Sequence, residues 1–356
     1  MKINEKFLED YLNSNSPTGF EYELGGQKVW MDYIEKYVDK VEIDNYGTAY
    51  GIMGNMDSDF KVVIEAHADE ISWFVNHIDS KGYIKVIRNG GSDAQIAPSM
   101  RVTLWGENGP VQGIFGHPAI HISYRKKDVD LDSIFIDVGA SSKQEVIDMG
   151  INVGTVVTFV DGFMKLGEDF YTGRALDNRI GGFMIAEVAR RLKEKGKELP
   201  FKLYIVNSVQ EEVGLYGASM ITDTIKPNVA IVTDVCHETS SPCYNASKEG
   251  EHIAGSGGVI TRAPAVHNIL RKLVLDTAAK KEIPFQLAAS SRSTGTDTDA
   301  FAFSNGGVPS VLISLPLKYM HTTVESTHKD DVKNVIKLIY HTLLNIEENH
   351  NFKYNA

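Results

Sequence analysis

Two adjacent carboxylates, Glu211 and Glu212, follow a mostly apolar run that ends at Val209. The run Phe201–Val209 is typical of a strand buried on both faces, and such strands usually belong to parallel sheets. The carboxylates would then lie just beyond the carboxyl end of that strand, where open α/β sheets bind ligands. Because neighbouring side chains leave an extended backbone in opposite directions, one could hold a cation while the other faces a substrate. The alternative is a solvated surface pair at a strand end.

Three more residues that can bind a metal stand at or shortly after the ends of predicted strands. The strands and the residues that follow them are Lys61–Ala66 with His67, Val229–Thr233 with Asp234, and Val308–Leu315 with His321. A fourth candidate, Asp177, lies just ahead of the predicted helix Asn178–Lys195. If the sheet is parallel, these side chains share one edge of it, and that shared placement favours a common ligand over isolated polar residues.

With Glu212, these candidates supply two histidines, two aspartates and one glutamate. A mixed nitrogen and oxygen shell suits Zn²⁺, Co²⁺ or Mn²⁺. Five side chains are too many for one tetrahedral catalytic metal, but they suit two metals that share a bridging carboxylate. Each residue alone has another explanation, since His67 could be a hydrogen-bonded histidine at a strand end and Asp177 could cap a helix. Asp234 and His321 could line a polar cleft.

The elements that must position these residues alternate between strand and helix over most of the chain. This order favours an α/β fold with a doubly wound, mostly parallel sheet flanked by helices. Apolar periodicity predicts further helices over Met1–Asn13, Glu21–Tyr37, Ala218–Thr224, a segment opened by Pro264, and Asp331–Ile346. Two more strands are expected at Val41–Ile43 and Thr48–Met53.

From about Ser72 to Asp161 the pattern changes to short β-rich pieces divided by Gly and Pro turns. The pieces are Trp73–Ile78, Tyr83–Arg88, Met100–Trp105, Val111–Ile114, Ser133–Asp137 and Val156–Val160, with one helix over Ser142–Met149. This pattern predicts a small β-barrel or sandwich inserted into the α/β chain. We therefore expect a catalytic domain of residues 1–71 and 162–356 and an inserted β domain of residues 72–161.

Composition limits the possible classes of protein. The 356 residues include 42% hydrophobic residues and carry a net charge of −11, which suits a soluble globular protein and argues against a nucleic-acid surface. No apolar run could span a bilayer, and the charged N-terminus lacks a signal-peptide core. With Cys236 and Cys243 as the only cysteines, we expect a reduced, cytoplasmic location. A nucleophile elbow, a phosphate loop and a His-Glu-x-x-His helix are all missing.

Several segments match one family of two-metal exopeptidases in order and spacing. They are Ala66–Ile71, Gly173–Arg179, Val209–Gly214, Thr233–Val235, Gly295–Asp297 and Tyr319–His321. On these motifs most of the chain, the inserted region included, resembles the glutamyl, deblocking and tetrahedral aminopeptidases. The resemblance implies a metal-dependent aminopeptidase that hydrolyses N-terminal residues from short peptides with a water activated by two metals. It also implies a homo-oligomer, as in the family's tetrahedral dodecamers, with the inserted domain serving in assembly or as a lid.

The same resemblance implies a role for each candidate residue. The implied ligands form two pairs and a bridge: His67 with Asp234 on one metal, Glu212 with His321 on the other, and Asp177 between them. Glu211 would be the general base that takes a proton from water and passes it to the departing amine. Asp69, two residues after His67, would hold that imidazole and fix which nitrogen faces the metal.

Three other functions fit parts of this pattern. A metal-dependent deacylase of N-blocked amino acids would use the same site on other amides. A glycoside hydrolase would pair Glu211 with Asp177 or Asp234 and would need neither histidine nor metal. A binding or scaffold protein would keep an inactive site, although the complete set of ligands and base argues against it. The preferred N-terminal residue, the native metal and the oligomeric state stay open.

Overall fold

The centre of the molecule is an eight-stranded mixed sheet in the order β1-β2-β12-β3-β13-β16-β14-β15. The computed structural model describes residues 2–122, 129–348 and 350–354. The strands of this sheet are β1 (Lys40–Ile43), β2 (Ala49–Gly54), β3 (Lys61–His67), β12 (Lys202–Ser208), β13 (Val229–His237), β14 (Gly258–Arg262), β15 (Phe285–Ala289) and β16 (Ser310–Leu317). The neighbours β12, β3, β13 and β16 run parallel, so their carboxyl ends meet at one edge. The α/β fold with a parallel centre is confirmed, and antiparallel pairs lie to either side of it.

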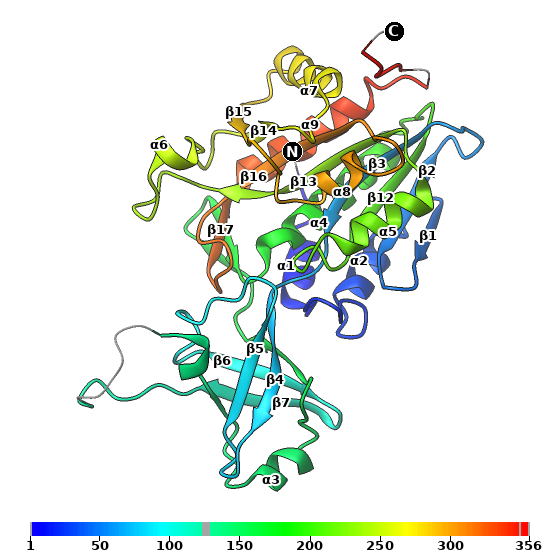
Figure 1. The fold of residues 1–356 in the computed structure, drawn as a ribbon. Coiled ribbons are helices and arrows are strands. Elements are labelled where there is room, and N and C mark those ends of the chain that lie inside the picture. Colours follow the sequence, from blue (N-terminus) through cyan, green and yellow to red (C-terminus); the bar gives the residue numbers. More distant parts are fainter. Residues whose placement is uncertain (1, 123–128, 349, 355–356) are drawn as a thin grey trace.

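Helices cover both faces of this sheet (Figure 1). The helices of the α/β body are α1 (Glu5–Asn13), α2 (Gly26–Ile34), α4 (Leu176–Glu194), α5 (Tyr216–Ile225), α6 (Ala246–Glu249), α7 (Asn268–Lys280), α8 (Thr298–Ala302) and α9 (Lys329–Leu343). Helix α4 packs on β3, β12 and β13 and is covered by α1, α2 and α9, whereas α5 and α8 contact each other and the sheet. The predicted apolar stripe of α4 is fully buried, at Ile180, Phe183, Met184, Val188 and Leu192. Burial of each such side chain contributes roughly 1.5–3 kcal/mol, which anchors the start of this helix against the sheet.

A closed barrel interrupts the α/β chain between β3 and α4. Its strands are β4 (Ser72–Ile78), β5 (Ile84–Asn89), β6 (Arg101–Gly106), β7 (Gly109–Phe115), β8 (Ile136–Asp137) and β9 (Val156–Phe159), with the short helices η1 (Leu131–Ser133) and α3 (Lys143–Asp148) beside them. Trp73, Phe115 and Phe159 pack against one another in a core separate from that of the α/β body. The barrel projects from one end of the body (Figure 1), in agreement with the predicted small barrel.

Some elements differ from the sequence-based expectation. Strand β13 continues beyond Thr233 to His237, so Asp234 lies within the strand rather than after it. Helix α7 begins at Asn268, because Pro264 lies in the turn that precedes it. The strands β14 and β15, the helix α8 and a small sheet of β10 (Met164–Leu166), β11 (Phe170–Gly173) and β17 (Glu325–His328) were not predicted. These pieces are short and several are polar, so they lack the apolar period that identifies a strand.

None of the helices in residues 2–122, 129–348 and 350–354 combines the length and the apolar character needed to cross a membrane.

Candidate metal centre

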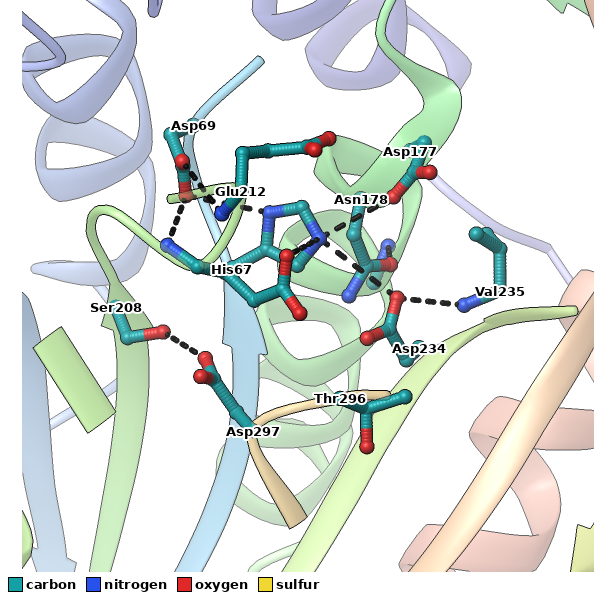
Figure 2. Close-up of polar contacts among 12 residues, drawn as sticks. His67, Asp69, Asp177, Asn178, Ser208, Glu212, Asp234, Val235, Thr296 and Asp297 are labelled. Carbon is teal, nitrogen blue, oxygen red and sulfur yellow. Dashed lines mark hydrogen bonds and ion pairs between the residues drawn. The ribbon is translucent and has the colours of Figure 1, made fainter. Parts of the chain in front are cut away.

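Predicted ligands from separate chain segments converge at the carboxyl edge of the parallel strands (Figure 2). His67 is the last residue of β3, and its Nε2 lies 3.2 Å from Asp177 Oδ1 and 3.7 Å from Asp234 Oδ1. His321 Nε2 lies 3.4 Å from Glu212 Oε1 on the other side of the site. The structure therefore brings all five proposed ligands together, although they span more than two hundred residues of sequence.

Asp177 stands between the two histidines. Its Oδ1 faces His67 Nε2 at 3.2 Å, and its Oδ2 faces His321 Nε2 at 3.3 Å. Two sets of possible metal ligands, each with ligand atoms within 4.8 Å of one another, share this residue: His67 with Asp177 and Asp234, and Asp177 with Glu212 and His321. One carboxylate with an oxygen toward each set has the geometry of a bridge between two ions.

Two of these proposed ligands, Asp177 and His321, lie on irregular backbone. Asp177 is placed at the start of α4, but its ψ of 109° is outside the helical range. His321 follows β16 in a turn and has a φ of 61°, in the left-handed region. Neither backbone N–H therefore belongs to a helix or a sheet ladder, and each needs another acceptor.

The charge balance of the site suits a divalent cation. His67, Asp177 and Asp234 are buried, and the ion pairs that the structure describes at these carboxylates involve only the two imidazoles, not a lysine or arginine. Buried carboxylates are costly unless they are neutralised. Nitrogen and oxygen donors of this kind suit borderline divalent metals, so the residues present fit a metal centre.

Without a metal, protons would supply part of the missing positive charge. Burial opposes protonation of His321, but hydrogen bonds to Asp177 and Glu212 outweigh it and raise the pKa of the imidazole to about 11. Burial likewise opposes protonation of His67, yet Glu211 and Asp177 raise the pKa of this imidazole well above its usual value. A metal ion would have to displace these protons before it could bind.

Glu211 occupies a position distinct from its neighbour. Its Oε2 lies 3.8 Å from His67 Nε2, whereas Glu212 turns toward His321. Burial raises the pKa of the Glu211 carboxyl to about 10, and the charges of Asp234 and other carboxylates add to the effect against the influence of His67. The two adjacent glutamates thus face different histidines, but they do so from a turn after β12 and not from the extended backbone that the sequence analysis assumed.

Asp69 joins β3 to the loop after β12. Its Oδ1 lies 3.3 Å from His67 Nδ1, and Thr18 donates a hydrogen bond of 2.9 Å to Oδ2. The backbone N–H groups of Glu211 and Glu212 donate to the two Asp69 oxygens at 3.0 and 3.2 Å. Asp69 therefore contacts the imidazole predicted for it and also fixes the glutamate pair, a contact the sequence did not predict.

Sequence reasoning missed two further buried carboxylates. Glu325 accepts backbone hydrogen bonds from Asp177 and His321, and Asp297 accepts one of 2.7 Å from the Ser208 hydroxyl. Asp297 lies in a segment singled out by the family resemblance, which assigned it no role. The sequence contains one indication of Glu325: it lies four residues after His321 and is the charged residue in the otherwise uncharged run Thr-Thr-Val-Glu-Ser-Thr.

The barrel also reaches the site. Gly91, in the loop between β5 and β6, lies so close to His321 that a Cβ on Gly91 would be 2.5 Å from the imidazole Nδ1. At the preceding position, a Cβ on Gly90 would lie 3.2 Å from the Cβ of Glu212. This loop therefore supports the His321 half of the site from behind.

Comparison with known proteins shows what kind of enzyme carries this arrangement. Residues 47–338 match the family model of the M42 glutamyl aminopeptidases. The chain belongs to the M42 glutamyl aminopeptidase family. The lysyl aminopeptidase of Pyrococcus furiosus is 34% identical to this M42 aminopeptidase over 340 residues, with 94% of this chain and 95% of that protein covered. The predicted family and the predicted aminopeptidase activity are therefore confirmed, and the deacylase and glycoside hydrolase alternatives are not favoured.

Solved structures of similar enzymes support the same fold for this M42 aminopeptidase. A TET aminopeptidase from Thaumarchaeota archaeon SCGC AB-539-E09 superposes with a TM-score of 0.89 at 29% identity, covering 95% of each chain. The TET1 peptidase of Pyrococcus horikoshii gives a TM-score of 0.82 at 26% identity, covering 95% of this chain and 98% of that one. The latter is described as assembling into a tetrahedron or a large octahedral shell. Similarity over nearly the whole length includes the barrel as well as the α/β body.

Proposed function

We propose that His67, Asp177, Glu212, Asp234 and His321 hold two divalent metal ions, and that the enzyme removes N-terminal residues from short peptides at this centre. The observation that carries the proposal is the position of Asp177, whose two carboxylate oxygens each face a different histidine at 3.2 and 3.3 Å. His67 and Asp234 would complete one ion's shell, and Glu212 and His321 the other's. Zn²⁺ and Co²⁺ suit this mixture of ligands best, with Mn²⁺ as a further candidate.

Ions held by these residues would supply Lewis acidity, which would lower the pKa of a water molecule and polarise a peptide carbonyl. Glu211 is the general base of the proposal. It belongs with His67 and Glu212 to a third group of possible metal ligands, but the other five side chains already supply both proposed shells, and Glu211 Oε2 lies 3.8 Å from His67 Nε2. It would take the proton from the attacking water and deliver it to the departing amine. Asp69 would position other residues and not take part in the reaction itself, since it contacts His67 at Nδ1 and accepts a hydrogen bond from the backbone N–H of Glu211.

Removing the bridge tests the metal assignment most directly. Asp177→Ala should lower the metal content at both positions, because both shells lose a ligand. Asp234→Ala is the matched comparison, since it should weaken only the position held with His67. Elemental analysis of protein equilibrated with Zn²⁺ or Co²⁺ measures both variants against the wild type. Full occupancy of both positions in Asp177→Ala would rule out the bridge.

Membership of the family supports peptides with a free N-terminus as substrates, but it does not indicate which N-terminal residue is preferred. Activity on a panel of aminoacyl-p-nitroanilides, beside the matching N-acetylated compounds, measures both preference and need for a free amino group. We expect cleavage of the free-amine compounds alone, and we expect a chelator to abolish this activity and added metal to restore it. Equal cleavage of the blocked compounds would instead support a deacylase.

We propose that residues 1–71 and 162–356 form the catalytic domain, while the barrel region 72–161 contributes to a homo-oligomer. The assembly described for the Pyrococcus horikoshii relative supports this division, as does the barrel's separate core. Sedimentation should therefore show assemblies larger than a monomer at micromolar concentration, with a tetrahedral dodecamer as the specific expectation. The zinc identity and the cytoplasmic location stay predictions from ligand types and cysteine content.

A further inference from the structure

Glu325 lies behind the site and contacts the backbone of two proposed ligands. Its Oε2 accepts a hydrogen bond of 3.0 Å from the N–H of Asp177, and its Oε1 accepts one of 2.7 Å from the N–H of His321. The residue is 2% exposed, so water does not compete for these contacts. One carboxylate thus joins the bridging ligand to a ligand of the second ion.

The strand β17 places Glu325 between the two segments that carry these ligands. On one side β17 pairs with β11, where Glu325 lies opposite Gly173, four residues before Asp177. On the other side the bridge between Lys318 and Ser326 ties β17 to the chain that leads from β16 into the His321 turn. Both segments therefore approach Glu325 from fixed directions, and its side chain spans the gap between them.

The local backbone explains why a carboxylate stands here. Neither Asp177 nor His321 lies in regular structure, so the buried N–H of Asp177 and the partly buried N–H of His321 have no partner within a helix or sheet. Leaving such donors unpaired is unfavourable. Each of the two oxygens of a carboxyl group can accept a hydrogen bond, whereas an amide has one accepting oxygen and one donating nitrogen. Glu325 can satisfy both donors at once, and glutamine cannot.

We propose that Glu325 is a positioning residue that sets the separation of Asp177 and His321, and so shapes the pocket for the ion that they share with Glu212. This inference rests on the proposed two-metal function. Glu325 itself belongs to none of the three ligand groups found among the described residues. Both of its oxygens accept backbone N–H groups of proposed ligands, and these contacts give it the role of fixing those ligands.

The chain provides a matched control in Asp331. This buried carboxylate also accepts two backbone hydrogen bonds, from the N–H groups of Gly255 and Gly257 at 2.6 Å each. Neither glycine is a proposed ligand, and Asp331 lies in the first turn of α9. Asp331→Asn therefore removes the same kind of contact as Glu325→Gln without touching the metal centre.

The experiment compares metal-free Glu325→Gln, Asp331→Asn and wild-type protein by titration with Co²⁺, followed by visible absorption and calorimetry. Thermal unfolding of each metal-free protein is measured in parallel. Glu325→Gln should weaken binding of the ion held with His321 by roughly 10–100-fold, as is usual when a partner of a metal ligand is lost. Asp331→Asn should lower the unfolding temperature and leave Co²⁺ affinity within twofold of wild type. Glu325→Asp, which keeps both accepting oxygens on a shorter side chain, should fall between wild type and Glu325→Gln.

Wild-type Co²⁺ affinity in Glu325→Gln would overturn the inference. So would an equal loss of affinity in Asp331→Asn, because the effect would then reflect general destabilisation. If Glu325→Gln does not fold, Glu325→Asp makes the measurement, and an unchanged Co²⁺ affinity there would also overturn it. Failure of the wild-type enzyme to bind Co²⁺ would refute the two-metal function itself, which separates the two proposals.

Discussion

Asp69 and Glu325 support the site on different kinds of backbone: Asp69 contacts His67 and both glutamates, whereas Glu325 contacts Asp177 and His321. Asp69 follows β3 directly and reaches across to the loop after the adjacent strand β12. The half that it holds therefore follows from two neighbouring parallel strands. Glu325 instead holds Asp177 and His321, which both lie on irregular backbone. The edge of a sheet can thus align proposed ligands through the order of its strands, whereas proposed ligands away from that edge need an acceptor dedicated to their backbone N–H groups.

The largest expected effect comes from changing Glu211, which belongs to neither proposed pair of metal ligands. Glu211→Gln should lower kcat by about 10²–10⁴-fold, the usual contribution of general acid–base catalysis, while both metals stay bound. The neighbouring change Glu212→Gln is the control, since it should reduce metal content as well as turnover. Steady-state kinetics together with elemental analysis distinguish the two. Near-normal turnover in Glu211→Gln would remove this residue from the mechanism.

A smaller effect is expected on the half that Asp69 holds. Asp69→Asn keeps one accepting oxygen but weakens the support of His67 Nδ1 and of the glutamate N–H groups. We expect a loss of roughly 10–100-fold in metal affinity or turnover. Combined with Glu325→Gln in a double-mutant cycle, the two changes should add nearly independently if the halves are separate. A coupling of several-fold in Co²⁺ affinity would show instead that the halves act as one unit.

The smallest predicted effect is a dependence of metal affinity on pH, shared by both halves. In the metal-free site, hydrogen bonds to carboxylates raise the pKa of His321 to about 11 against the effect of burial. The imidazole therefore keeps its proton at neutral pH and must lose it to bind a metal, so affinity should fall as pH is lowered. Calorimetry in two buffers of different ionisation enthalpy measures the protons released. Binding heats that do not depend on the buffer would contradict this.

The predictable part of the molecule is the part in which the local sequence pattern and the tertiary structure agree. The apolar runs before His67 and Glu211 identified β3 and β12, and parallel pairing then placed both residues at one edge. Asp234 was found although β13 continues past it, because the apolar part of the strand ends at Thr233. The resemblance to the family indicated which proposed ligands share a metal ion, because the spacing of apolar residues carries no such information.

The rest could not be read from the sequence because it depends on contacts between distant segments. Glu325 lies in a short polar strand, and its function emerges only when that strand lies between the Asp177 and His321 segments. The same holds for Gly91, whose importance comes from the imidazole behind it rather than from its neighbours in the chain. Neither residue has a local pattern that distinguishes it from a loop residue.

The closeness of Gly91 to His321 restricts how the barrel and the α/β body of this protein can diverge or be recombined. A methyl group added at Gly91 would lie 2.5 Å from the imidazole Nδ1 of His321, so a loop of the barrel occupies the space next to that ring. A chimaera that takes its barrel from a relative must therefore reproduce this loop as well as the strands around it. Transplanting the barrel alone would shift His321, a proposed metal ligand, however well the two folded units matched elsewhere.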